Sequence, residues 1–317
     1  MRVLLSLLVL LSLFAVSVQA WAPTNSRAFY LGDRPHLHRL LQTSRTSKGW
    51  GSAESTSDAI SVYKAISTAV PDAAGLCKPL EHSFTEAIKE KNLVNTHYWG
   101  ASLVDIGCVV PSTVTADLKP LLQSGLHSNV LNDVYHASSL IFSLLDKKKL
   151  VQASDFDFTR VSATLLELLD EDGSFRSGPQ DDEGSAYHAG LALQIAGKLA
   201  NKVTAQADKQ KDLVRKLTSK VPAILALGLK EKVVDFSFGA PSHVSPLEAV
   251  ASVVEGIQAL SLAADKLDIK EVSKYIQNNT DTDNNSNKHL STQYWFPSVL
   301  CIFLMVFFFP CLCFFFS

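Results

Sequence analysis

The feature that most constrains this fold is a helical pattern that recurs along the chain. An aromatic residue is followed by small residues and then by aliphatic residues at helical spacing, and in four successive copies the aromatic is Tyr63, Tyr98, Tyr135 and Tyr187. A weaker copy surrounds residues 248–252. Small residues let helix backbones approach one another, and the intervals of 35, 37 and 52 residues are typical of stacked helical pairs, open as a solenoid or closed as a ring.

The apolar spacing predicts an all-α domain over residues 21–276. From residue 57 onward the periodicity is helical almost throughout, and no run alternates in the way that strands and hairpins require. Residues 187–200 are apolar on several sides and predict a buried inner helix. Residues 198–221 carry a narrow apolar stripe among lysine, glutamine and aspartate, which predicts an outer helix with a solvated back.

An acidic turn strengthens the prediction of repeated pairs. Residues 168–175 combine acidic side chains with Gly173 and Phe175, directly ahead of the fourth copy of the pattern. This segment resembles the linker of α/α-toroid repeats, as found in terpenoid cyclases and prenyltransferases. The resemblance implies an α/α toroid-like arrangement of helical pairs.

The N-terminus has the pattern of a secretory signal peptide over residues 1–20. Arg2 is followed by an apolar run and by small residues that fit cleavage between Ala20 and Trp21. An uncleaved anchor is the alternative interpretation, although the apolar run is short for a membrane span. Cleavage would leave the body in an oxidising compartment.

The C-terminal tail, residues 294–317, is almost entirely apolar. Phe296–Ser317 holds 8 of the 17 phenylalanines, so the mean hydropathy of +0.13 does not describe the body. Its length suffices to cross a bilayer. Three interpretations stay open: a membrane anchor, a glycolipid-anchor signal with small residues at 285–287, or an extension foreign to the fold.

An asparagine-rich linker, residues 277–293, joins the body to this tail. Such a polar run cannot bury a core. It contains the two sequons of the chain, at Asn278 and Asn284, which are candidates for glycosylation in a secretory compartment. Unmodified sequons in an asparagine-rich run are the alternative.

Cys77 and Cys108 are the two cysteines of the body. In an oxidising lumen one bond between them is expected over two free thiols. In the chain-entropy picture such a bond contributes about 3–4 kcal/mol to stability. The expected bond would join the segment after the helix that carries Tyr63 to the end of the helix that carries Tyr98.

Composition and motifs indicate no active site. The 29 basic and 31 acidic residues leave no basic excess of the kind that nucleic-acid binding requires. The acidic runs at 170–173 and 181–184 miss the Asp-x-Asp-Asp pattern of class II terpene cyclases, so we interpret them as solvated turns. No phosphate-cradling glycine loop or nucleophile motif is present. We therefore predict no catalytic residues, no cofactor and no small-molecule substrate.

The spacing of potential ligands does not favour a zinc site. Cys108 with His136 or His188 lacks the close ligand spacing of such sites. His97, His136 and His188 each lie beside a marker tyrosine, and their position in the repeat accounts for them. The prediction is that the chain holds no metal.

Three segments together are similar to the N-terminal lumenal domain of the ribophorin II family. They are residues 55–75 with Cys77 just after them, residues 98–108 ending at Cys108, and residues 129–145, and the likeness extends over about residues 29–276. It implies a lumenal domain at the endoplasmic reticulum membrane and a non-catalytic subunit of the oligosaccharyltransferase, which transfers dolichol-linked glycan to asparagine. The expected partners are the other subunits of that complex.

The tail departs from this family pattern. Family members continue into β-rich segments and several membrane helices, so the resemblance implies a truncated form whose assembly into the complex has to be tested. Two hypotheses from other classes stay open. One is a toroid enzyme of the terpenoid-cyclase or prenyltransferase type, and the other is a membrane-anchored module that binds peptides on a concave face.

Overall fold

A computed structural model describes residues 34–65, 67–146, 151–203, 207–230, 233–234 and 236–266. The predicted signal peptide with its Ala20–Trp21 cleavage site, the linker with Asn278 and Asn284, and the apolar tail lie outside these ranges. Within them the chain is helical, which confirms the predicted all-α class. The α-helices are α2 (Arg34–Ser44), α3 (Ala53–Ala65), α4 (Ala73–Lys89), α5 (Leu93–Ile106), α6 (Thr115–Leu126), α7 (Leu131–Asp146), α8 (Thr159–Glu167), α9 (Ala186–Lys202), α10 (Ala207–Gly228) and α11 (Pro246–Lys266).

The remaining regular structure of the described residues is minor. Two short 3₁₀ turns, η1 (Ser112–Val114) and η2 (Ala153–Asp155), precede α6 and α8. The strands β1 (Leu229–Lys230) and β2 (Val233–Val234) form one short antiparallel pair. No helix in the described ranges has the length and apolar character that a membrane span needs.

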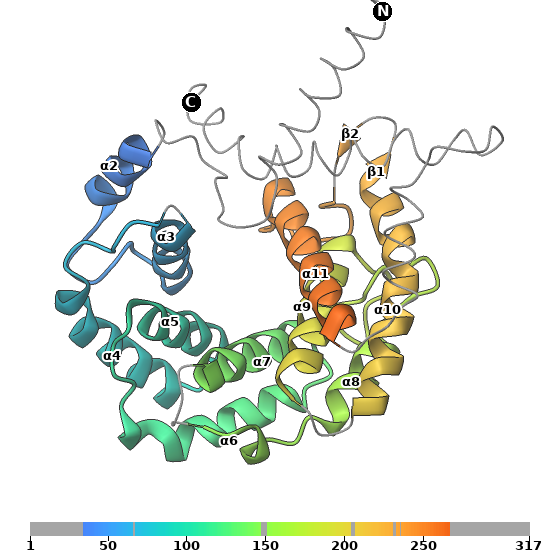
Figure 1. Cartoon of the computed structure of the whole chain (residues 1–317), viewed down its shortest axis with the longest axis horizontal. Coiled ribbons are helices and arrows are strands. Elements are labelled where there is room, and N and C mark those ends of the chain that lie inside the picture. Colours follow the sequence, from blue (N-terminus) through green and yellow to red (C-terminus); the bar gives the residue numbers. More distant parts are fainter. Residues whose placement is uncertain are drawn as a thin grey trace, which may run out of the picture.

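The helices follow one another around a curve, in an inner and an outer row (Figure 1). The inner row is α3, α5, α7, α9 and α11, and each of these contacts the next. The outer helices α4, α6 and α10 pack against α5, α7 and α9. The marker tyrosines Tyr63, Tyr98, Tyr135 and Tyr187 all lie on inner helices, which is where the repeating pattern predicts them. The weaker copy at residues 248–252 lies on the inner helix α11.

Local sequence signals set the ends of the inner helices. The side chain of Asn92 accepts a hydrogen bond from the Asn95 backbone N–H and begins α5, and Gly107 ends it with a φ of 81°. Ser185 begins α9 in the same way, by accepting from the His188 backbone N–H. These caps fix where the inner helices α5 and α9 start.

The tightest helix contact lies between α9 and α11. A Cβ atom added to Gly190 would lie 2.4 Å from the backbone carbon of Ser252, and one added to Gly197 would lie 2.4 Å from that of Ala259. Gly256 of α11 lies against Gly190 in turn. The two backbones therefore approach through glycines, as the small residues of the repeating pattern predict.

One predicted boundary is wrong. The outer helix expected over 198–221 begins at Ala207, and residues 198–202 belong to the inner helix α9. Leu199 and Ala200 are buried and continue the apolar face of α9, so the helix runs on until Val203, whose backbone is extended. The rest of the prediction is confirmed, because the apolar stripe of α10 is buried while Asp208 beside it is exposed.

Candidate functional site

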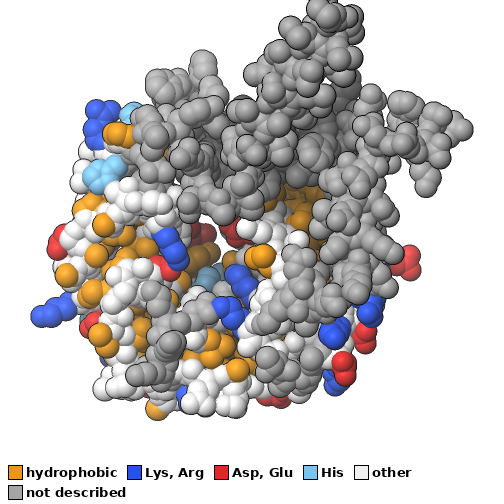
Figure 2. All heavy atoms as spheres, viewed as in Figure 1, with side chains coloured by type: hydrophobic (Ala, Val, Ile, Leu, Met, Phe, Trp, Pro, Cys, Tyr) orange, Lys and Arg blue, Asp and Glu red, His pale blue; other side chains and the backbone are white. Residues whose placement is uncertain are grey.

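Tyrosines from three consecutive inner helices line the inside of the curve. Tyr98 of α5, Tyr135 of α7 and Tyr187 of α9 are half-buried, and the phenol of Tyr135 lies within electrostatic range of the other two. Figure 2, in the same view as Figure 1, shows a hollow between these helices at the middle of the molecule. We call this space, which Tyr98, Tyr135 and Tyr187 border, the hollow.

The phenol groups in the hollow are held in their neutral form. Burial raises the pKa of Tyr187 to about 12, with a further contribution from Glu248. Burial also raises the pKa of Tyr98 and of Tyr135, and the negative charges of Glu54 and Glu255 respectively add to it. The three tyrosine side chains therefore line the hollow as uncharged groups at pH 7.

Carboxylates reach the hollow from both sides. Glu54 and Asp58 are four residues apart and so share one face of α3. Glu248 and Glu255 are seven residues apart and share one face of α11. Glu54 accepts a hydrogen bond from the Tyr98 hydroxyl at 3.2 Å.

The pKa of Asp58 responds to charges on both faces. It is raised to about 6, first by burial and then by the negative charges of Glu54, Glu248 and Glu255. Burial raises the pKa of Glu255 as well, although Lys198 opposes the shift. Both side chains are reached by water at the surface, yet protein surrounds them closely enough to weaken their solvation. The wall of a hollow has this combination of properties.

Lys198 of α9, which lies within electrostatic range of Lys202, brings a positive charge to the hollow. Its Nζ lies 5.8 Å from the centre of the Tyr135 ring, over the ring. Burial lowers its pKa, and the negative charge of Glu255 partly offsets this. The ammonium group makes no hydrogen bond or ion pair with another described residue.

A pair of buried histidines lies behind the tyrosines. The Nδ1 atoms of His97 and His136 are 3.0 Å apart, so one ring donates its N–H to the other. His97 also contacts the ring of Tyr135, and His136 that of Tyr98. Burial lowers the pKa of both, to about 4 for His136, so the pair is neutral at pH 7. The pair therefore supports the tyrosine rings from behind, which agrees with a role set by repeat position.

We expect acid to destabilise the fold through this pair. A histidine whose pKa is lower in the folded state binds its proton first in the unfolded state, so stability falls as the pH drops from about 6.5 toward about 4. The slope approaches about 1.4 kcal/mol per pH unit for each histidine. His136→Asn removes one such group and keeps a polar atom near Nδ1. Urea unfolding should show this variant less stable than the original at pH 7, with the difference shrinking toward pH 4.5.

The quantity to compare is the difference in free energy of unfolding between His136→Asn and the original protein. The raised pKa of Asp58 acts in the opposite direction over the same range, but it is common to both proteins and cancels. A stability difference that stays constant between pH 7 and pH 4.5 contradicts the assignment.

The predicted acidic turns come together elsewhere on the surface. Residues from both runs line one open pocket of about 360 Å³ beside Phe238. Asp172 accepts hydrogen bonds from the backbone and the hydroxyl of Ser174, and Asp170 pairs with Arg176 at 3.2 Å. These contacts fold the chain back on itself before α9, which agrees with the interpretation as turns. Within the described ranges no three histidine, cysteine or acidic side chains are grouped so that they could hold a metal ion.

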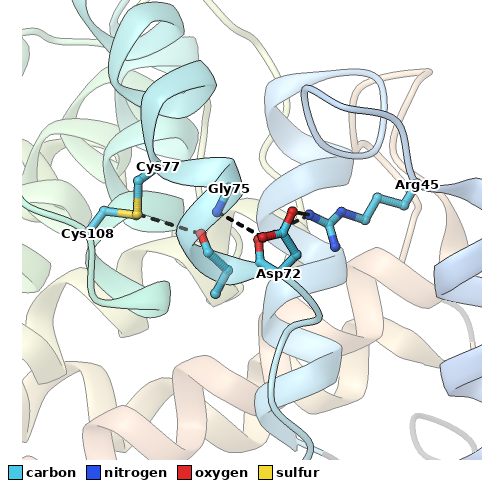
Figure 3. The surroundings of a disulfide bond; sticks show 6 residues. Arg45, Asp72, Gly75, Cys77 and Cys108 are labelled. Atoms are coloured by element: carbon cyan, nitrogen blue, oxygen red, sulfur yellow. Dashed lines mark hydrogen bonds and ion pairs between the residues drawn. A yellow bond between two sulfur atoms is a disulfide. The ribbon is translucent and has the colours of Figure 1, made fainter.

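Figure 3 shows the two body cysteines joined by a disulfide. The Cα atoms of Cys77 and Cys108 are 5.6 Å apart. Cys77 lies inside α4, just beyond the predicted segment after α3, and Cys108 follows the end of α5. Beside the bond, Asp72 begins α4 by accepting from the Gly75 backbone N–H and pairs with Arg45 at 3.6 Å.

Sequence reasoning missed the charged lining of the hollow. Glu54, Asp58, Glu248, Glu255 and Lys198 all lie on helices of the inner row, where most side chains are apolar or small. The sequence signal that could have revealed this lining is the presence of charged residues at helical spacing on an inner helix. That signal points to a site only when α3 and α11 are known to face the same space.

Comparison with known proteins extends this picture. A family model for the ribophorin II N-terminal domain matches residues 31–285. The chain is similar to the dolichyl-diphosphooligosaccharide–protein glycosyltransferase subunit swp1 of Dictyostelium discoideum, with 26% identity over 171 residues. That alignment covers 50% of this chain and 24% of the relative, so the match spans less than a third of the relative's length. No solved structure matches the chain.

The fold by itself defines an all-helical domain built from an inner and an outer row of helices. The family match covers most of that domain, and the chain belongs to the ribophorin II N-terminal domain family. This confirms the resemblance drawn from residues 55–75, 98–108 and 129–145.

Proposed function

We propose that this chain is a non-catalytic accessory subunit of the oligosaccharyltransferase complex, supporting N-linked protein glycosylation. The observation that carries the proposal is the family match over residues 31–285. The similarity to a glycosyltransferase subunit supports it. On this proposal the body lies in the lumen of the endoplasmic reticulum, attached to its membrane, and the partners are the other subunits of the complex.

The proposal includes an α/α toroid for residues 21–276. Its support is the inner row of helices, in which each member contacts the next and carries the repeating pattern. The electrostatic effect of Glu248 and Glu255 on Asp58 is further support, because it indicates that these residues of α11 lie within electrostatic range of α3, the first helix of that row. A ring of this kind presents an outer surface for docking to neighbouring subunits.

Affinity purification tests the subunit role. The tagged full chain, expressed in cells and extracted from endoplasmic reticulum membranes in mild detergent, should recover the catalytic subunit of the oligosaccharyltransferase. The same material should begin at Trp21 and shift on glycosidase treatment if Asn278 or Asn284 carries glycan. Recovery of no catalytic subunit, from a chain shown to be folded and lumenal, rejects the subunit role.

A further inference from the structure

The hollow contains charged groups that form no hydrogen bond or ion pair within the described part of the chain. Asp58 and Glu255 make no hydrogen bond or ion pair with another described residue, and the same is true of the Lys198 ammonium. Burial disfavours the charged form of all three groups, although Asp58 and Glu255 also reach water at the surface. Charges that are desolvated and unpaired cost stability. An arrangement of this kind is typical of binding sites, where the missing partners come with the ligand.

The balance of charge favours a cationic ligand. Four carboxylates, two on α3 and two on α11, outnumber the ammonium groups of Lys198 and Lys202, which lie within electrostatic range of each other. Of the four, Glu54 is engaged with the Tyr98 hydroxyl and Glu248 with the Ser245 backbone N–H at the start of α11. Asp58 and Glu255 stay available, on opposite sides of the hollow. A guanidinium or ammonium group placed between them would relieve the repulsion that adds to the effect of burial on the pKa of Asp58.

The aromatic wall suits the same ligand. The faces of Tyr98, Tyr135 and Tyr187 attract a cation through their ring electrons and pack against the methylene groups of its side chain. Lys198 already lies over the Tyr135 ring at 5.8 Å, which shows that this ring accepts a cation. The donors of Lys198 are unused and suit a carbonyl oxygen of a polypeptide backbone. A basic side chain on a peptide supplies both kinds of group, whereas a free metal cation supplies neither carbonyl nor methylene groups.

We propose that the hollow binds an extended polypeptide segment by receiving an arginine or lysine side chain between Asp58 and Glu255, against the three tyrosine rings. Arginine is the preferred residue, because its planar guanidinium both stacks on tyrosine and pairs with carboxylates through two hydrogen bonds. This inference goes beyond the subunit role and does not depend on it. Its test therefore uses a peptide and needs no other subunit.

Fluorescence anisotropy with the purified full chain in detergent provides that test. The probe is a labelled octapeptide of alternating arginine and serine, and the comparison peptides replace arginine by lysine, glutamine or glutamate. We expect affinity to fall in the order arginine, lysine, glutamine, with no binding of the glutamate peptide. The double variant Asp58→Asn/Glu255→Gln should bind the arginine peptide about tenfold or more weakly, because it removes the two charges that pair with the cation.

A matched control separates the hollow from general negative charge. Asp182→Asn/Glu183→Gln removes the same charge from the surface pocket before α9. We expect its affinity to stay within about twofold of the original, since exposed charges contribute little at ordinary salt. Equal loss of affinity in both double variants rejects the hollow as the site, and so does equal binding of the glutamate peptide.

Two further measurements keep the test decisive. Asp58→Asn/Glu255→Gln removes unpaired charges, so its free energy of unfolding should be no lower than that of the original protein. Weak peptide binding by this variant then reports loss of the site and not misfolding.

Analytical ultracentrifugation of the detergent-solubilised chain tests whether a second copy of the chain occupies the hollow. A concentration-dependent dimer that the arginine peptide leaves intact, while Asp58→Asn/Glu255→Gln abolishes it, overturns the proposal.

Discussion

Replacing Cys77 and Cys108 together by serine is expected to lower the free energy of unfolding by about 3–4 kcal/mol. The two cysteines are 31 residues apart, and the bond between them removes conformational freedom from the unfolded chain in proportion to the logarithm of that loop. In the folded protein it links α4 to the end of α5, at the side of the curve where Asp72 caps α4. Urea denaturation followed by circular dichroism measures the loss.

The reduced form of the original protein is the matched control. Treated with reductant, it should unfold at the same urea concentration as Cys77→Ser/Cys108→Ser. Each single serine variant should behave like the double one, because either removes the bond. A loss below about 1 kcal/mol in all of these proteins, or a free Cys77 in peptide mapping without reductant, contradicts a stabilising bond between the two residues.

The helical rows are predictable because their signal is local. A tyrosine followed by small residues marks the face along which one helix meets the next, so Tyr98, Tyr135 and Tyr187 identify inner helices from the sequence alone. The caps at Asn92 and Ser185 are likewise short-range features. Sequence periodicity reports which face of a helix is buried, and here that is enough to give the class of fold.

The hollow is not predictable from the sequence, because it depends on how helices that are far apart in the sequence lie in space. Periodicity assigns faces to one helix at a time, and it does not say that the carboxylates of α3 and those of α11, about 190 residues later in the sequence, border the same space. The misplaced boundary near Lys198 has a related cause. The local pattern assigns this lysine to the start of a solvated outer helix, whereas it belongs to an inner helix and lies over the Tyr135 ring.

Gly197→Leu is expected to lower the free energy of unfolding by about 3 kcal/mol or more, and Gly197→Ala by about 1–3 kcal/mol. Even the single methyl group of alanine would lie 2.4 Å from the backbone of α11, and backbone cannot move aside as a side chain can. By helix propensity alone alanine would stabilise α9 by about 1 kcal/mol, so the expected sign comes from packing. Thermal and urea unfolding of the two variants measure the effect.

Gly100→Ala is the matched control, because Gly100 also lies inside a helix of the inner row. A methyl group there would meet the ends of the Leu140 and Phe84 side chains, which can shift. We therefore expect a smaller loss than for Gly197→Ala. A displaced α11 would also carry Glu255 away from Asp58, so the arginine peptide should bind Gly197→Leu more weakly than Gly100→Ala. Equal stability of Gly197→Ala and the original protein would show that α9 and α11 do not meet through their backbones.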